Sequence, residues 1–267
     1  MSMQQIQTAT LRLNVADDGP RDAPAVVLSH SLAASLEMWQ PQVAALAREF
    51  RVIRYDTRGH GASEAPAGAY SFPDLLRDVI ALLDALGIAR AHFAGLSLGG
   101  MTALGLALEY PTRIASICAA NCGAQAAEGA EAMWGERIRV ARELGMQVLV
   151  ESTLARWFTP IMRATRAAEI APIAAMIAAT SVTGYIGCCE ALKTLAYRDR
   201  LATLSLPALF IAGAEDPAVP VAVMRDMHAR LSGSDYVELP SAHLSNLECV
   251  AAFNTALIDF LRAQARL

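Results

Sequence analysis

The sequence has few charged residues and no cluster of basic ones. Asp, Glu, Lys and Arg together make up 18% of its 267 residues, and the net charge is −4 at neutral pH. Nucleic acids and anionic membrane surfaces attract proteins with basic patches, so we expect neither as a partner. By contrast, 54% of the residues are hydrophobic. That share is enough for the core of one large domain with an insertion.

The sequence also lacks the usual marks of export and membrane insertion. Residues 1–5 contain neither a charge nor an apolar segment, so no signal peptide is predicted. Two long uncharged stretches, 91–108 and 170–189, are interrupted by glycine, proline or polar residues. Neither is therefore the continuous apolar run that a membrane-spanning helix needs. The five cysteines are an odd number without the paired spacing of zinc sites. These features favour a cytoplasmic protein with buried, reduced thiols.

Apolar runs alternate with helical patterns along most of the chain. An edge hairpin is expected over 6–14. We expect strands at 25–29, 51–55, 91–94, 114–119, 208–212 and 236–239. We expect helices at 38–48, 72–86, 101–109, 219–231 and 247–262. This alternation predicts an α/β fold with a mostly parallel, doubly wound sheet.

One long stretch interrupts the alternation. Residues 123–202 are nearly all helical in pattern, with Pro160 and Pro172 as expected breaks. Ligands bind at the carboxyl ends of the strands in such sheets. We therefore predict that 123–202 is a helical lid, inserted into a core formed by residues 1–122 and 203–267.

The segment Gly95-Leu96-Ser97-Leu98-Gly99 lies between an expected strand and an expected helix. It matches G-x-S-x-G, the nucleophile elbow, in which a strained serine projects from a sharp turn. Side chains two positions to either side would collide, which explains the two glycines. The alternative is a tight turn that merely contains a serine. The strand-to-helix position favours Ser97 as a nucleophile.

A serine nucleophile needs a base and a third group that orients the base. His243 follows the last expected strand, at the same sheet edge as the elbow, and is the candidate general base. Asp216 follows the preceding strand and is the candidate orienting carboxylate, with Glu215 as runner-up. For each, the alternative is a hydrogen-bonded loop residue. The other histidines are predicted to fix a glycine-rich turn (His60) or to be structural or exposed (His92, His228).

The tetrahedral intermediate of ester hydrolysis needs N–H donors for its oxyanion. One is expected from Leu98, directly after the nucleophile. The other is expected from Leu32, in the loop after the strand 25–29. His30 is predicted to brace this loop, with an exposed loop position as the alternative, and it is also a candidate for substrate binding.

Across nearly its whole length the sequence resembles the α/β-hydrolases, and more closely the 3-oxoadipate enol-lactonases. The chain order Ser97, Asp216, His243 is that of the α/β-hydrolases. The resemblance rests on the elbow and on residues 50–61, 155–158, 184–185, 189–191 and 243–248.

The resemblance implies a reaction and a set of substrate contacts. The reaction is hydrolysis of a carboxylate-bearing enol-lactone to 3-oxoadipate in bacterial aromatic catabolism (the β-ketoadipate pathway), without metal or cofactor. Residues 133–137 are similar to the family's substrate-facing segment, which makes Trp134 and Arg137 candidates, with Arg156 as a weaker one. A cation suits the substrate's carboxylate in a dry pocket. Trp134 could instead pack the lid, and Arg137 could be a solvated helix residue.

One departure leaves the substrate open. The family pattern in the oxyanion loop is Asn-Ser-Leu-Gly, whereas this chain has His30-Ser31-Leu32-Ala33. A broad-specificity carboxylesterase, another lactonase, and a hydrolase-fold ligand receptor are the alternatives. Dehalogenases and epoxide hydrolases are disfavoured because they use aspartate where Ser97 stands.

Overall fold

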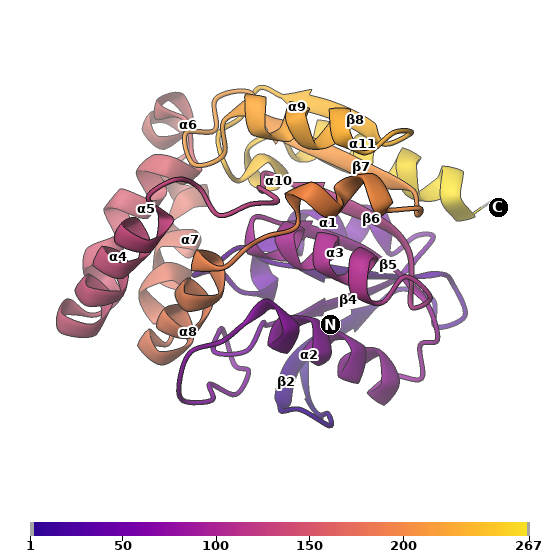
Figure 1. Cartoon of the computed structure of the whole chain (residues 1–267), viewed down its shortest axis with the longest axis horizontal. Coiled ribbons are helices and arrows are strands. Elements are labelled where there is room, and N and C mark those ends of the chain that lie inside the picture. Colours follow the sequence, from indigo (N-terminus) through magenta and orange to yellow (C-terminus); the bar gives the residue numbers. More distant parts are fainter. Residues whose placement is uncertain (1–2, 266–267) are drawn as a thin grey trace.

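A computed structural model describes residues 3–265 of the chain (Figure 1). The first two residues of the N-terminal stretch 1–5 lie outside the described residues. Eight strands form one sheet in the order β1-β2-β4-β3-β5-β6-β7-β8. They are β1 (Met3–Gln7), β2 (Arg12–Asp18), β3 (Ala25–Ser29), β4 (Arg51–Tyr55), β5 (Ala91–Leu96), β6 (Ile114–Ala120), β7 (Ala208–Gly213) and β8 (Asp235–Leu239).

The sheet is parallel from β4 to β8, and only β1 and β2 run antiparallel to their neighbours. This confirms the predicted α/β sheet. Every residue of β3, β5 and β7 is buried, which explains why these strands are continuous apolar runs. The edge hairpin is present, but its turn lies at residues 8–11, inside the stretch 6–14, where the Thr8 N–H donates to the Leu11 carbonyl.

Helices cover both faces of the sheet (Figure 1). The core helices are α1 (Gln40–Leu46), α2 (Phe72–Ala85), α3 (Leu98–Glu109), α9 (Val221–Arg230), α10 (Ser245–Glu248) and α11 (Val250–Ala265). The helix α2 packs beside α3, and α1 packs beside α11. Two predicted helices are each divided: a 3-10 turn, η1 (Leu36–Trp39), precedes α1, and Cys249 separates α10 from α11.

The stretch between β6 and β7 is helical, and Figure 1 shows α4, α5, α7 and α8 gathered at one side of the sheet. Its helices are α4 (Ala130–Leu144), η2 (Gln147–Leu149), α5 (Val150–Trp157), α6 (Pro160–Thr165), α7 (Ala167–Ala179), α8 (Val182–Lys193) and η3 (Arg198–Thr203). Within the described residues, no single helix is long and apolar enough to cross a membrane. Only α7 and α8 taken together reach that length and composition, across a bend of 90°.

The two prolines in this stretch behave differently. Pro160 begins α6, and the Thr159 hydroxyl caps that helix by accepting the Met162 N–H. Pro172, however, lies inside α7, so the predicted break there is wrong. The proline removes only the bond to the Ala168 carbonyl, and because Ala168 and Pro172 are both exposed, water can satisfy that carbonyl.

Backbone contacts hold the helical stretch against the rest of the chain. The Leu244 N–H donates to the Trp157 carbonyl at 3.0 Å, which joins the end of α5 to the loop after β8. Gly59 and Gly184 touch so closely that a Cβ on Gly184 would lie 1.9 Å from the Gly59 oxygen. All five cysteines are free; four are buried, and Cys249 is half-buried.

Candidate active site

Ser97 sits at the turn between β5 and α3. Its φ of 57° is in the left-handed region, which a serine rarely adopts. A Cβ on Gly95 would lie 2.0 Å from the Gly99 oxygen, and one on Gly99 would lie 2.1 Å from the Ser29 oxygen. Only glycine fits at either position. The Ser97 N–H donates to the Ala120 carbonyl at 2.9 Å, which fixes the turn to the end of β6.

The structure brings Asp216 and His243 together from two loops that follow neighbouring strands, β7 and β8. His243 Nδ1 lies 2.7 Å from Asp216 Oδ2, and both side chains are buried. The second carboxylate oxygen, Oδ1, accepts the N–H groups of Ala218 and Val219 at 2.8 and 3.0 Å. The runner-up, Glu215, is exposed and does not reach His243.

Asn121 is a member of this network that the sequence reasoning did not include. Its Nδ2 donates to Asp216 Oδ2 at 3.0 Å, and its Oδ1 accepts from the Ser245 hydroxyl at 2.5 Å. The residue is fully buried and has a φ of 45°. Its position directly after β6, at the same sheet edge as the elbow, is the feature that could have pointed to it.

The hydrogen bonds around Asp216 decide its charge. Burial alone would raise the pKa of this carboxyl, but the charge and hydrogen bond of His243, with the donors from Asn121 and Val219, outweigh it. The pKa therefore lies below its usual value. Asp216 is an anion at neutral pH and holds a proton on the facing Nδ1 of His243.

The loop after β3 is held from behind by two buried histidines. His30 Nε2 accepts the Thr57 N–H at 2.9 Å, and its Nδ1 lies 2.8 Å from the Ser31 carbonyl. Both ring nitrogens are thus used, and the ring is wholly buried. His30 does not line the cavity described below. Its place among the substrate-binding candidates is wrong, and the bracing position is the one observed.

His60 lies against the same loop. Its Nε2 accepts the Ala33 N–H at 3.1 Å, and its ring centroid is 5.3 Å from that of His30. This is the loop-fixing position that the sequence predicted. Ala33 has a φ of 64°, a region that favours glycine, so the loop holds a strained alanine where the family pattern has glycine.

Ser97 and His243 line one cavity of about 120 Å³. Its floor comes from the loops at the strand ends and from α3: Ser31, Leu32, Ala33, Ser97, Met101, Ala218, Val219 and His243. Its roof comes from α4, α5 and α8: Trp134, Arg137, Thr153, Arg156, Trp157, Tyr185 and Leu192. Of the candidate residues, Ser97, His243, Leu32, Trp134, Arg137 and Arg156 border this space, whereas Asp216, Leu98 and His30 do not. Within residues 3–265, no group of three or more His, Cys, Asp or Glu could hold a metal ion.

Two arginines of the roof carry charge that no carboxylate neutralises. Neither Arg137 nor Arg156 forms an ion pair with any residue between 3 and 265. Arg137 lies over the Trp134 ring, 5.4 Å from its centroid, in a cation–π contact. Arg156 makes only a long contact, 3.5 Å, to the Thr153 hydroxyl. Both residues are half-buried and line the cavity, so they bring two positive charges to its roof.

Comparison with known proteins gives consistent results. A family model described as the alpha/beta hydrolase fold matches residues 24–249. The 3-oxoadipate enol-lactonase 2 of Acinetobacter baylyi is 40% identical over 245 residues, which cover 92% of this chain and 91% of that protein. A crystal structure of the enol-lactonase from Burkholderia xenovorans LB400 aligns with a TM-score of 0.94 and 40% identity, covering 97% and 100% of the two chains.

A second kind of relative is more distant. A putative carbamate hydrolase RutD of Variovorax paradoxus is 32% identical over 251 residues, covering 91% of this chain and 93% of that protein. These two kinds of relative therefore carry different hydrolase names over almost the same span of sequence.

Proposed function

This chain belongs to the alpha/beta hydrolase family, and from that premise we propose that it is a serine hydrolase that converts 3-oxoadipate enol-lactone to 3-oxoadipate. The observation that carries the proposal is the shared cavity of Ser97, His243 and two unpaired arginines. The names of the relatives at 37–40% identity support the same substrate.

The proposed reaction begins with acylation of Ser97. The Ser97 hydroxyl oxygen attacks the lactone carbonyl carbon while His243 Nε2 takes the hydroxyl proton. Asp216 holds the other ring nitrogen and stabilises the imidazolium that forms. The bond to the ring oxygen then breaks, and this oxygen leaves as an enol that receives the proton from His243. The opened chain remains attached to Ser97 as an acyl ester.

Two backbone N–H groups are proposed to stabilise the oxyanion of each tetrahedral intermediate. The Leu98 N–H is the first of α3 and has no carbonyl four residues earlier in its helix. The Leu32 N–H has no acceptor within residues 3–265. Each such donor contributes on the order of 10²–10³ in rate. Water activated by His243 then releases the acid and restores Ser97, and the enol becomes the ketone. Lactone and water together give 3-oxoadipate.

The roof is proposed to select the substrate by charge and size. The carboxylate of the lactone would meet Arg137 and Arg156, whose guanidinium groups lack a counter-ion in a half-buried setting. A charge-assisted hydrogen bond of this kind contributes about 1.5–3 kcal/mol. The volume, about 120 Å³, is below the roughly 300–1,000 Å³ of sites for drug-sized ligands. The site therefore suits a small anionic ester.

We make three further proposals, on the role of residues 123–202, on the cellular compartment and pathway, and on a second candidate substrate. We propose that residues 123–202 act as the lid of the site, because their helices supply the whole roof. We also propose a cytoplasmic enzyme of the β-ketoadipate pathway, since free buried thiols suit a reducing compartment. The relatives named carbamate hydrolase make a small carbamate the second candidate substrate.

Steady-state kinetics on three substrates test the proposal. We would compare kcat/KM for 3-oxoadipate enol-lactone, an uncharged ester of similar size and a small carbamate, with Ser97→Ala as the control. We expect kcat/KM for the lactone to exceed that for the uncharged ester by at least about tenfold, because the lactone carboxylate binds the arginines. Ser97→Ala is expected to lose on the order of 10⁴-fold or more while remaining folded.

Other outcomes would replace the proposal. Equal rates on lactone and uncharged ester would indicate a general carboxylesterase, and a preference for the carbamate would favour the second candidate. A single burst without turnover would indicate a ligand receptor. Full activity in Ser97→Ala would remove the serine mechanism altogether.

A further inference from the structure

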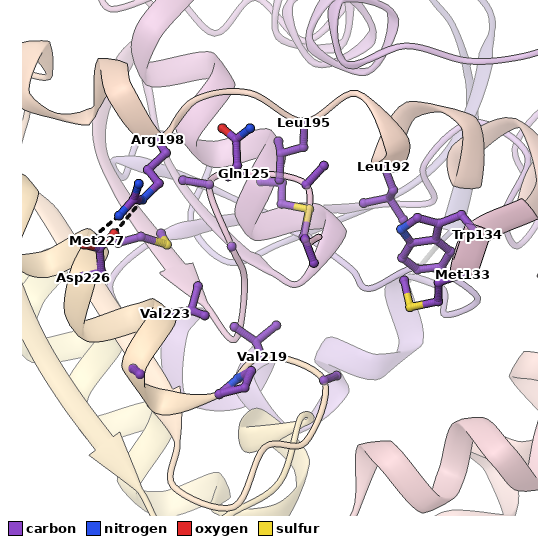
Figure 2. Close-up of a pocket in the computed structure, with 18 residues that line it drawn as sticks. Gln125, Met133, Trp134, Leu192, Leu195, Arg198, Val219, Val223, Asp226 and Met227 are labelled. Carbon is purple, nitrogen blue, oxygen red and sulfur yellow. Dashed lines mark hydrogen bonds and ion pairs between the residues drawn. The ribbon is translucent and has the colours of Figure 1, made fainter. Parts of the chain in front are cut away.

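A second and larger pocket, of about 610 Å³, lies beside the catalytic cavity (Figure 2). We call it the apolar pocket. It lies between α4, α8, α9 and the loop 123–127. Met133 of α4 and Val223 of α9 line it and are 47% and 39% exposed, so the pocket opens to the protein surface. The mechanism described above does not use it.

The two spaces share one wall. Five residues line both of them: Met101, Trp134, Leu192, Ala218 and Val219. The partition between the reacting serine and the apolar pocket is therefore a single layer of side chains. Figure 2 shows Trp134 and Leu192 side by side along one edge of the pocket, with Val219 and Val223 below.

The apolar pocket differs from the catalytic cavity in charge. Its charged lining residues, Arg198 and Asp226, pair with each other at 2.9 and 3.2 Å, away from Trp134 (Figure 2). Among the described residues that line it, no charge lacks a partner. Most of the remaining lining is alanine, valine, leucine and methionine. Such a surface suits a neutral hydrocarbon group, and its lining provides no unpaired cation for a carboxylate.

We propose that the apolar pocket is a second substrate subsite, which receives the hydrocarbon chain of an uncharged alkyl ester whose carbonyl reacts at Ser97. The carbonyl would occupy the small cavity, and the chain would cross the shared wall. Met101 is the side chain suited to move aside, because its unbranched thioether has three rotatable bonds. The reaction is ester plus water to carboxylic acid plus alcohol, through the same acyl ester on Ser97.

This inference rests on the proposed serine chemistry but not on the identity of the anionic lactone. It predicts a second activity, on neutral esters that are too long for a cavity of about 120 Å³. A passage for substrate entry is the competing use of the same pocket. The two uses predict different rates. A subsite raises kcat/KM for an ester with a longer chain, whereas a passage gives the same kcat/KM for short and long esters.

Chain length is the variable to test. We would measure kcat/KM of the wild-type enzyme for ethyl acetate, ethyl hexanoate and hexyl acetate by following acid release. The last two place the added chain on the acyl side and on the alcohol side respectively. Each methylene buried in an apolar site favours binding by about fourfold. We expect at least a tenfold advantage over ethyl acetate for one of the two longer esters.

A filling variant tests the location. Val223→Trp places a large ring in the apolar pocket without touching the catalytic cavity, because Val223 lines only the former. The advantage of the longer ester should fall about tenfold, and the rate on ethyl acetate should not change. Ala229→Trp is the matched control, since Ala229 is also exposed on α9 but lies outside the pocket. Trp134→Ala, which opens the wall, should raise the ratio of long to short ester.

Three results would overturn the inference. They are equal rates on all three esters, no turnover of alkyl esters by an enzyme that hydrolyses the lactone, and an equal loss on all esters in Val223→Trp. The last would make the pocket a passage. Failure of the serine chemistry is distinguishable, because ethyl acetate hydrolysis would then survive in Ser97→Ala.

Discussion

The floor and the roof of the cavity that Ser97 and His243 line come from different parts of the chain and differ in chemistry. The floor consists of loops at the ends of parallel strands and the start of α3, and its polar groups are tightly bonded: Asp216 alone has four hydrogen-bond partners. The roof consists of α4, α5 and α8, and its two arginines have no ionic partner among the described residues.

This difference suggests that the floor stabilises the transition state and the roof selects the substrate. A preorganised floor can stabilise the transition state of any ester that reaches it, because its dipoles are fixed before the substrate arrives. Unpaired cations in the roof can act only on a substrate that brings a negative charge. Changes to the floor should therefore affect all substrates equally, and changes to the roof should affect the choice among them.

Among changes to the floor other than at Ser97, the largest effect is expected from Asp216→Asn. The amide cannot hold the His243 tautomer that accepts the serine proton, and a comparable change in a serine protease costs about 10⁴-fold. We expect a loss of that order in kcat for the anionic lactone and for an uncharged ester alike. Glu215→Gln is the matched control, since this neighbouring carboxylate is exposed, and it should leave both rates unchanged. A loss confined to one substrate would contradict the claim that the floor acts on all substrates alike.

A smaller effect is expected from Asn121→Gly. Glycine accepts the φ of 45° but removes the amide that donates to Asp216. Because a hydrogen bond to a charged group contributes about 1.5–3 kcal/mol, kcat should fall by roughly tenfold to a hundredfold on both substrates. The pKa of Asp216 should rise, because the carboxylate loses one of its donors. An unchanged kcat on both substrates would reduce Asn121 to a structural role.

The two buried histidines behind the floor, His30 and His60, should make the stability of the folded protein depend on pH. Burial lowers the pKa of His30 to about 4 and that of His60 to about 3, from 6.5. Below pH 6.5 the unfolded chain binds protons that the folded chain does not, so stability falls as pH falls from 6.5 towards 4. At pH 5 each histidine should cost about 2 kcal/mol relative to pH 7 or above.

Thermal unfolding between pH 8 and pH 5 measures this effect. The midpoint should fall by roughly 10 °C, given about 2–4 °C per kcal/mol for a chain near this size. His30→Asn should reduce the slope, whatever it does to stability at pH 8, and His60 and His92, whose pKa values burial also lowers, should account for the remainder. Asp216 does not interfere, because its pKa lies below its usual value and outside this window. A flat profile would mean that these rings are not held neutral in the folded protein.

The floor was more predictable from the sequence than the roof, for a physical reason. A strained serine turn needs glycine at fixed positions, and parallel strands end at one edge, so Ser97, Asp216 and His243 could be assigned to one site by spacing alone. The structure places all three at that edge. Asn121 was not predicted, because its position directly after β6 was its only signal and an amide there belongs to no sequence motif.

The roof depends on how helices pack, and one sequence carries little of that information. Arg137 and Arg156 come from different helices, and nothing in their spacing shows that they face the same cavity. Pro172 was predicted to break a helix but lies inside α7, where Ala168 and Pro172 are both exposed and water can satisfy the freed carbonyl. The apolar pocket depends on α4, α8 and α9 together, so no local pattern could have shown it.

The most direct test of the account is the ratio of kcat/KM for 3-oxoadipate enol-lactone to that for an uncharged ester of similar size. It should be measured in wild type, Arg137→Ala, Arg156→Ala and the double variant. Arg139→Ala is the control, because Arg139 lies on the same helix but is exposed and paired with Glu136 and Glu143. We predict that the ratio falls at least tenfold in one single variant and further in the double variant, while the uncharged ester keeps its rate. A ratio unchanged in the double variant would contradict the division between a catalytic floor and a selective roof.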